Sequence, residues 1–333
     1  MQLKLKNIGM IKEADIAIDG LTVIAGENDT GKSTVGKALF AMLNGISLDG
    51  ELVEFYYQHV LEKTFKLKLN QFPKDAFIDL YTNHAKYYIE LGEGVQGAST
   101  FHRDKHFKGV MFVESPLVWN LQDLFGVSAN IESHLKMMGQ EIEIPYPYLM
   151  KDLYFKLATQ KGDSQNDNSA SLKRNLVEIM QGEFRQDKQS RIFSFHRAEK
   201  TFDLINVATG IKTFGIIQVL IDNNRLVKDT VLILDEPEVH LHPKWQLKMA
   251  EIIVELIKNG VKVVVNSHSP YMIEALQRYS ELEKVNADFY LAEDGVIGKV
   301  DDSNSKTLSK IFSKLSEPFD LFEEMESERF QNG

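Results

Sequence analysis

The octet Gly26-Glu27-Asn28-Asp29-Thr30-Gly31-Lys32-Ser33 decides the fold, because it satisfies the pattern G-x-x-x-x-G-K-[ST] at every position. The residues before it, LTVIA at 21–25, predict a short buried strand, and residues 34–43 predict a helix with apolar residues on one side. Strand, glycine loop and helix together are the context in which this pattern cradles phosphate groups. An accidental match of a glycine turn is the alternative, and the flanking pattern argues against it.

The chemistry of such a loop comes from its backbone. Glycines at 26 and 31 let successive N–H groups approach a phosphate without a Cβ clash, and the following helix N-terminus adds partial positive charge. Lys32 is expected to reach the β- and γ-phosphates as a catalytic residue, and the Ser33 hydroxyl to hold Mg²⁺. The predicted nucleotide-binding residues are Gly26, Asn28, Asp29, Thr30, Gly31, Lys32, Ser33 and Thr34.

Bulk composition narrows the functional classes. The chain has 333 residues, of which 43% are hydrophobic and 26% charged, as in an ordinary soluble protein. It has no cysteine, which excludes disulfides, thiolate zinc sites and cysteine nucleophiles. The net charge of −10 disfavours a stand-alone, tight nucleic-acid binder. No apolar signal core or membrane-length segment is evident, so we expect a cytoplasmic protein without membrane contact.

The pattern along the chain predicts one domain over 1–333. Residues 1–8 and 11–18 predict two strands before the loop strand, two of the three forming an antiparallel hairpin. Residues 76–91 mix helix and strand signals, and residues 110–113 predict a buried strand. The predicted parts are an inserted, mostly helical lobe at 117–189, an acidic helical tail at 301–333, and a core that the resemblance of its motifs to a known family places at 1–45, 108–116 and 190–300.

A second motif lies about two hundred residues after Lys32, a separation that requires a large insertion. The run Val231-Leu232-Ile233-Leu234-Asp235-Glu236 predicts a buried strand that delivers two acids at its C-terminal end, where α/β sheets bind ligands. Asp235 is expected to help hold Mg²⁺, and Glu236 to act as general base toward the attacking water. A solvated acidic turn is the alternative for this pair.

Together with a third segment, these motifs resemble the ABC-type ATPase heads, a group that includes SMC-like and OLD-like proteins. The three segments are GENDTGKS at 26–33, LILDEPE at 232–238 and Asn266-Ser267-His268-Ser269-Pro270, which follows a predicted strand at 261–265. The resemblance implies that His268 contacts the γ-phosphate. A histidine with a purely structural role is the alternative.

Two further segments refine the resemblance. Thr209-Gly210 stands before a predicted helix where the family has a Ser-Gly-Gly signature, and the resemblance implies that it caps the phosphate of the opposite protomer. The segment E-x-H-L-H-P at 238–243 resembles OLD-like, RecF-like and Septu-type ATPases more than transporter ATPases. We expect a dimer-contact loop there, with a metal pair of His240 and His242 as the alternative. Glu114-Ser115 stands where the family carries a glutamine.

The resemblance implies an α/β P-loop NTPase of the ABC-head type, with a mixed central sheet, an antiparallel N-terminal subsheet and an inserted helical lobe. It further implies ATP and Mg²⁺ as cofactors and a homodimer joined through ATP-sandwiched composite sites. ATP hydrolysis would then gate a separate effector, such as a nuclease in anti-phage defence. After residue 297 we expect no nuclease domain of the TOPRIM type. A RecF- or SMC-like ATPase acting directly on DNA, and a nucleotide sensor without turnover, are the alternatives.

Overall fold

The computed structural model describes residues 1–46, 53–92, 106–139, 147–161, 169–301 and 303–331, so parts of the predicted lobe, at 140–146 and 162–168, lie outside the described residues. Its strands are β1 Gln2–Ile8, β2 Ile11–Ala17, β3 Leu21–Ala25, β4 Phe77–Tyr81, β5 Lys86–Glu90, β6 Gly109–Val113, β7 Glu183–Gln186, β8 Phe193–Arg197, β9 Lys200–Asp203, β10 Thr230–Asp235, β11 Lys262–Ser267, β12 Ala287–Glu293 and β13 Val296–Gly298. Its helices are α1 Lys32–Ile46, α2 Val53–Phe65, α3 Gln122–Met137, α4 Tyr148–Ala158, α5 Ala170–Met180, α6 Thr209–Asp222, α7 Pro243–Lys258, α8 Pro270–Glu283 and α9 Asn304–Gln331.

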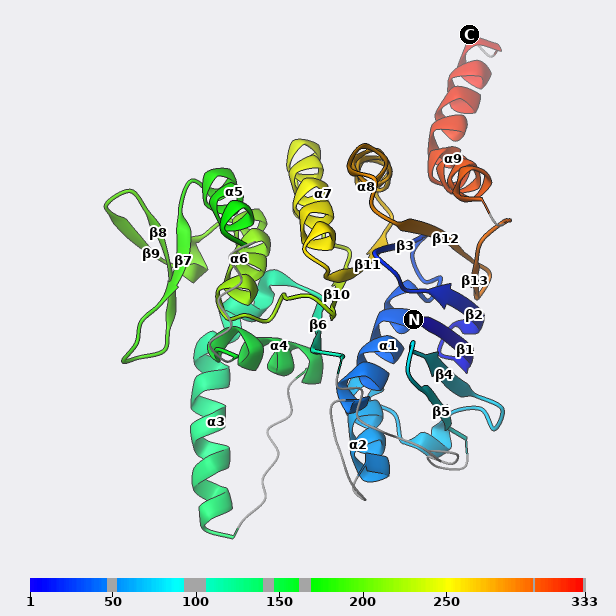
Figure 1. Ribbon diagram of the computed structural model, residues 1–333. Helices are drawn as coiled ribbons and strands as arrows, with labels where there is room; N and C mark the ends of the chain where they lie inside the picture. The colour runs from blue at the N-terminus through cyan, green and yellow to red at the C-terminus, as the bar shows by residue number, and fades with distance from the viewer. Residues whose placement is uncertain (47–52, 93–105, 140–146, 162–168, 302, 332–333) are drawn as a thin grey trace.

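One mixed sheet organises the described chain (Figure 1). Its ten strands follow the order β5-β4-β1-β2-β13-β12-β3-β11-β10-β6. The strands β12, β3, β11, β10 and β6 pair in parallel, whereas β5, β4, β1 and β2 form an antiparallel extension. The mixed sheet and the antiparallel N-terminal part are therefore confirmed, and the two parts are continuous because β13 pairs with β2.

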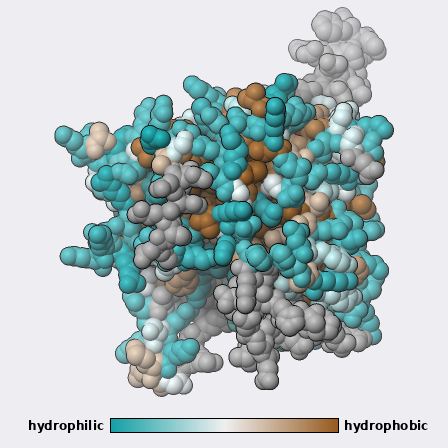
Figure 2. All heavy atoms as spheres, viewed as in Figure 1, coloured by the Kyte–Doolittle hydropathy of each residue, from teal (hydrophilic) through white to brown (hydrophobic). Residues whose placement is uncertain are grey.

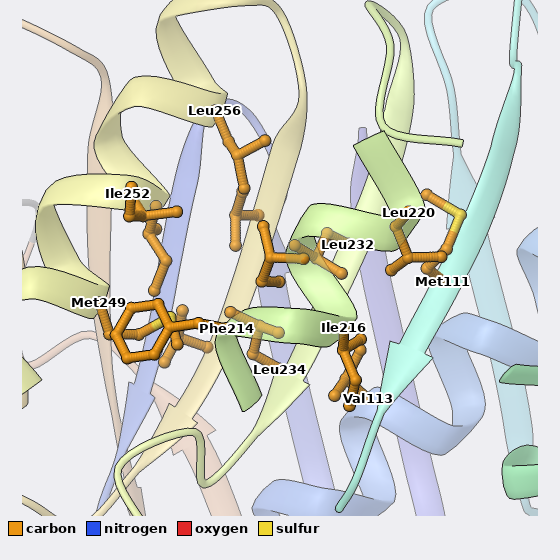
Figure 3. Packing of buried hydrophobic residues seen from close by; sticks show 14 of the residues in the cluster. Met111, Val113, Phe214, Ile216, Leu220, Leu232, Leu234, Met249, Ile252 and Leu256 are labelled. Carbon is orange, nitrogen blue, oxygen red and sulfur yellow. The ribbon is translucent and has the colours of Figure 1, made fainter. Parts of the chain in front are cut away.

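Side chains alternate between the two faces of the parallel strands, and each face has its own hydrophobic core. On β10, Leu232 and Leu234 join the core shared with α5 to α9, whereas Val231 and Ile233 join the core shared with α1 and α2. Figure 3 shows the first of these cores, where Phe214 of α6 and Met249 of α7 pack beside Leu234. A strand buried on both faces needs the continuous apolar run that 231–234 provides.

The order of the strands fixes where the loops meet. Strand β11 lies between β3 and β10, with Asn266 opposite Asp235 on one side and Ser267 opposite Ala25 on the other. The loop after β3 and the acidic end of β10 therefore open onto the same edge of the sheet, because parallel strands end together.

The remaining elements lie around this sheet. Residues 117–189 contribute α3, α4 and α5, and α3 extends away from the sheet in Figure 1. The small antiparallel sheet β7-β8-β9 lies on the side of the molecule opposite the antiparallel extension β5-β4-β1-β2 (Figure 1). The mixed signals at 76–91 resolve as the β4–β5 hairpin, with no helix. Here Asp79, 5% exposed, lies on the face of β4 opposite the core residues Ile78 and Leu80 and pairs with Lys86.

The long helix α9 occupies most of 301–333 and begins beside β12, where Leu308 and Ile311 join the core. The face in Figure 2 carries mainly hydrophilic residues, with hydrophobic ones visible between them. Among the described helices, none is both long enough and apolar enough to cross a lipid bilayer.

Candidate functional site

The loop between β3 and α1 is held closely by its neighbours. Gly31 has φ +92°, and a Cβ placed on it would lie 2.8 Å from Ile11 Cγ1 of β2. A Cβ on Gly26 would overlap the Ala292 carbonyl oxygen of β12. Both predicted glycines are therefore required by packing as well as by the approach of a phosphate. Asp29 also adopts a left-handed conformation, with φ +62°.

The other predicted residues of this loop take different positions. Asn28 and Asp29 are exposed, and the Thr30 hydroxyl donates to the Glu27 carbonyl oxygen at 2.8 Å. Thr34 lies in the first turn of α1 under the β1–β2 turn, since a Cβ on Gly9 would lie 3.4 Å from its Oγ1. The loop is thus anchored on its inner side and open on its outer side.

Lys32 lies in the centre of the loop. Its Nζ donates to the carbonyl oxygens of Gly26 at 3.0 Å and Glu27 at 2.5 Å. Burial lowers the pKa of Lys32, and the nearby carboxylates of Glu236 and Asp235 partly offset that effect. The first turn of α1 has no acidic residue, so the partial positive charge of this helix end is not neutralised locally.

Ser33 and Asp235 meet as the sequence predicts for a magnesium site. The Ser33 hydroxyl donates to Asp235 Oδ1 at 3.0 Å, and the Asn266 amide donates to the same oxygen at 2.8 Å. Burial raises the pKa of Asp235, and these two hydrogen bonds oppose the shift. A hydroxyl and a carboxylate fit Mg²⁺, which takes few protein ligands and completes its shell with water and phosphate oxygens. Accordingly, the described residues contain no cluster of three or more His, Cys, Asp or Glu ligands.

Glu236 and His268 also come together across the two neighbouring loops. His268 Nδ1 lies 3.2 Å from Glu236 Oε1, and each side chain is about one-third exposed (39% and 34%). Glu236 has φ +49°, and its N–H donates to the Asn266 carbonyl oxygen at 2.9 Å. This left-handed conformation ends the strand and directs the Glu236 carboxylate toward His268. Residues with such strained backbones are common at functional sites.

A cavity of about 230 Å³ opens beside these groups. It is bordered by Ser33, Asp235 and Glu236, by Glu114 from the loop after β6, and by Thr213 of α6. Glu114 Oε1 lies 3.9 Å from Lys37 Nζ on α1. The position at which the family carries a glutamine therefore faces this site with a carboxylate.

The signature-like pair lies at the first turn of α6. Thr209 opens this helix, and a Cβ on Gly210 would lie 3.1 Å from Leu241 Cδ2 and 3.4 Å from the His240 carbonyl oxygen. Within the part of the chain that the structure describes, neither residue borders the cavity, although Thr213 one turn later does. The structure therefore does not join this pair to the Lys32 site of the same chain.

The two histidines of E-x-H-L-H-P lie in different environments. His240 is exposed, has φ +68° and borders the cavity. His242 Nδ1 accepts the Lys244 N–H at 3.3 Å and so caps α7. The geometry gives no support to the metal-pair alternative.

Sequence reasoning missed three supporting residues. Asn266 and Glu238 stand in the segments that carry the resemblance, yet only the structure shows that Asn266 binds Asp235 and that Glu238 accepts the His268 N–H. Gln246 was not singled out, and it is buried beneath the same loops. For Asn266 the signal is a polar residue at the end of an otherwise apolar strand.

Comparison with known proteins agrees with this geometry. The family model described as "AAA domain, putative AbiEii toxin, Type IV TA system" matches residues 140–274, which include Asp235 and His268. The Septu protein PtuA of Bacillus thuringiensis is 36% identical over 45 residues, which cover 14% of this chain and 11% of that protein. The matched part is thus about a tenth of the length of this curated relative.

Solved structures support the fold. The structure of an SMC head bound to the C-terminal winged-helix domain of ScpA has a TM-score of 0.51 at 15% identity, covering 92% of this chain and 98% of that one. An ADP-bound ATP-binding cassette of an ABC transporter covers 96% of each chain at 14% identity, but its TM-score of 0.42 is too low to carry an argument. The chain therefore has the fold of an ABC-type ATPase head, with a complete phosphate-binding loop, and its residues 140–274 are similar to the AAA domain of the matching family model.

Proposed function

We propose that the protein binds Mg-ATP and hydrolyses it to ADP and phosphate. The observation that carries this proposal is the meeting of two pairs at one sheet edge: Ser33 with Asp235 at 3.0 Å, and Glu236 with His268 at 3.2 Å. The complete phosphate-binding loop beside them supplies Lys32 and the N-terminus of α1. Each pair has an established chemical use in phosphoryl transfer.

In this proposal, the backbone of the loop and Lys32 bind the phosphates, and Lys32 exchanges its two carbonyl partners for phosphate oxygens. Ser33 and Asp235 would hold Mg²⁺, which neutralises charge on the phosphate oxygens when bound. Glu236 takes a proton from the attacking water as the water oxygen bonds to the γ-phosphorus and the bond to ADP breaks. His268 would contact the γ-phosphate through its other ring nitrogen, which donates a hydrogen bond only when both ring nitrogens carry protons, because Nδ1 faces the Glu236 carboxylate.

We further propose that two copies close on ATP and that the cycle gates a separate effector protein, in a defence system of the Septu type. Three features support dimerisation: the half-buried Thr209 and Gly210 at the start of α6, the exposed Val239 and His240 beside them, and the partial exposure of Glu236 and His268. The partial match to the Septu protein PtuA supports the defence role.

The test is ATP turnover measured together with solution mass, for the wild type and for Glu236→Gln. General-base catalysis contributes about 10²–10⁴-fold. We therefore expect Glu236→Gln to lower kcat at least about 100-fold and to accumulate a dimer in Mg-ATP. Loss of turnover without a dimer would refute the dimer cycle. A wild type that binds ATP but releases no phosphate, alone or with DNA, would refute hydrolysis.

The alternative is direct action on DNA, which the likeness of the fold to an SMC head favours. Binding of a labelled duplex would then weaken steeply as salt rises, because neutralised phosphates release counterions. With a net charge of −10, we expect no retention of duplex DNA even at low salt. Salt-dependent DNA binding that stimulates turnover would overturn the effector proposal in favour of the alternative.

A further inference from the structure

A buried carboxylate lies behind the catalytic pair and is used by none of the steps above. Glu238 is 4% exposed and belongs to the loop that follows β10. Its Oε1 accepts the Ser267 hydroxyl at 2.6 Å, the His268 N–H at 3.0 Å and the Ser269 N–H at 3.3 Å. One carboxylate oxygen therefore binds three consecutive residues of the neighbouring loop.

The contacts continue into a closed polar network. The Ser269 hydroxyl donates to Gln246 Oε1 at 2.6 Å, and Gln246 Nε2 donates to the Leu241 carbonyl oxygen at 3.0 Å. The Leu241 N–H in turn donates to the Glu238 carbonyl oxygen at 2.9 Å. The side chains of Ser267, Ser269 and Gln246 are all buried. The network joins the loop 237–241 to the loop 267–269 at both ends.

A buried charge is costly unless it is well hydrogen-bonded, and fully connected buried networks restrict a structure to one geometry. Burial raises the pKa of Glu238, whereas the bonds from Ser267 and the His268 backbone lower it. Hydrogen bonds to the charged form thus offset part of the penalty of burial. Glu238 Oε1 accepts two of its three hydrogen bonds from the backbone N–H groups of His268 and Ser269. These bonds therefore fix the position of the loop that carries His268.

We infer that Glu238 is a positioning residue: it fixes the His268 backbone so that Nδ1 meets Glu236, and it ties that histidine to the exposed Val239–His240 loop. This inference rests on the proposed function, because it concerns the same site. His268 Nδ1 also lies 3.7 Å from Glu238 Oε1, so the ring sits between the two carboxylates. Glu238 itself contacts no reacting atom.

The same network gives the histidine a connection to the surface. Gly210 at the start of α6 packs against Leu241 and the His240 carbonyl oxygen, and Leu241 is bonded to both Gln246 and Glu238. A protein that displaces Val239 or His240 would therefore move a segment whose buried end holds His268. The coupling is a physical path of packed and hydrogen-bonded groups, and it requires intact bonds at Glu238.

The first test is Glu238→Gln, which keeps the shape of the side chain and removes its charge. The amide oxygen can still accept the three hydrogen bonds, but a neutral acceptor holds them only about half as strongly as a carboxylate. Its NH₂ group also enters a buried position where, among the described residues, Glu238 Oε2 has no hydrogen-bond partner. A misplaced catalytic group can lower rate about 100-fold. We expect kcat to fall by about that factor, while KM and the affinity for a fluorescent ATP analogue change less than about threefold. The matched control is Glu251→Gln on α7, an exposed carboxylate paired with Lys248.

Wild-type kcat in Glu238→Gln, with Glu236→Gln inactive, would overturn the inference and leave the proposed function standing. Loss of nucleotide affinity equal to the loss of kcat would also overturn it, because it would indicate a general structural role. Ser267→Ala removes one of the three bonds and should lower kcat by a smaller factor, of about 10-fold.

A second measurement does not depend on turnover. Protein labelled with ¹³C at histidine Cε1 gives one signal per ring, and the His268 signal is assigned by its absence in His268→Asn. We expect Glu238→Gln and Ser267→Ala to shift that signal and Glu251→Gln to leave it in place. If the wild type hydrolyses no ATP, the proposed function fails, and an unshifted His268 signal in Glu238→Gln would then reject the positioning role independently.

Discussion

Asn266→Ala should lower the free energy of unfolding most at neutral pH and least in acid. The Asn266 side chain is fully buried, and its amide donates to Asp235 Oδ1 at 2.8 Å. A hydrogen bond to a charged group contributes about 1.5–3 kcal/mol. Deleting it should therefore lower the free energy of unfolding by about 2 kcal/mol at neutral pH, which corresponds to a fall in Tm of roughly 3 °C for a chain of this size.

The dependence on pH follows from Asp235. Burial raises its pKa, and the Asn266 amide is the first effect that lowers it again, so the pKa of Asp235 rises further in Asn266→Ala. The charged carboxylate needs the amide and the protonated one does not. The loss of stability is thus present above the raised pKa and disappears as pH falls through it. Urea unfolding followed by tryptophan fluorescence, at about pH 7.5 and about pH 4.5, measures both states.

The matched control is Asn223→Ala, since the Asn223 amide donates to the Leu157 carbonyl oxygen and to no carboxylate. Its loss of stability should be the same at both pH values. An equal loss for Asn266→Ala at both pH values would refute the reasoning, because the bond would then not act through the charge of Asp235. In Mg²⁺ titrations of nucleotide binding, Asn266→Ala should also weaken apparent metal affinity about 10–100-fold.

Three further outcomes are expected. Gly31→Ala forces a side chain into φ +92° and a Cβ to 2.8 Å from Ile11 Cγ1, so it should destabilise the chain by about 1–3 kcal/mol in urea unfolding and abolish binding of a fluorescent ATP analogue. Lys32→Met removes an ammonium whose pKa burial lowers; nucleotide binding should disappear in the same assay, while Tm changes by less than about 3 °C. Leu234→Ala opens a cavity in the core of Figure 3 and should lower the free energy of unfolding by about 3 kcal/mol, whereas a loss below about 1 kcal/mol would mean that the core collapses around it.

Local pattern was sufficient for the central elements. Strands β3, β10 and β11 are mostly apolar because both of their faces are buried. Such a run predicts a buried strand even when its neighbours in the sheet are unknown. The sequence pattern also predicts the phosphate-binding loop, because its glycines stand where a side chain would collide with Ile11 or Ala292. The sequence also placed Asp235 and Glu236 at a strand end.

Other features depend on contacts between distant residues. The β4–β5 hairpin was obscured because Asp79 stands on a buried face, and its charge is explained only by Lys86 across the turn. The bonds of Asn266 to Asp235 and of Glu238 to Ser267 join residues 31 and 29 positions apart. A pattern within one element predicts which face of a strand is buried; it does not identify the partner of a polar group on another element.

The strand order explains why these partners come from β11. Because β11 separates β3 from β10, the residues at its C-terminal end stand between the phosphate-binding loop and the acidic pair. Asn266 turns toward Asp235, and Ser267 turns toward Glu238 on the opposite face, as successive residues of a strand must. One face of β11 therefore supports the Asp235 carboxylate and the other supports the loop that carries His268. A shift of β11 relative to β10 would break both contacts at once. Single substitutions at 266 and 267 should instead impair nucleotide turnover through separate contacts, the first through Asp235 and the second through Glu238.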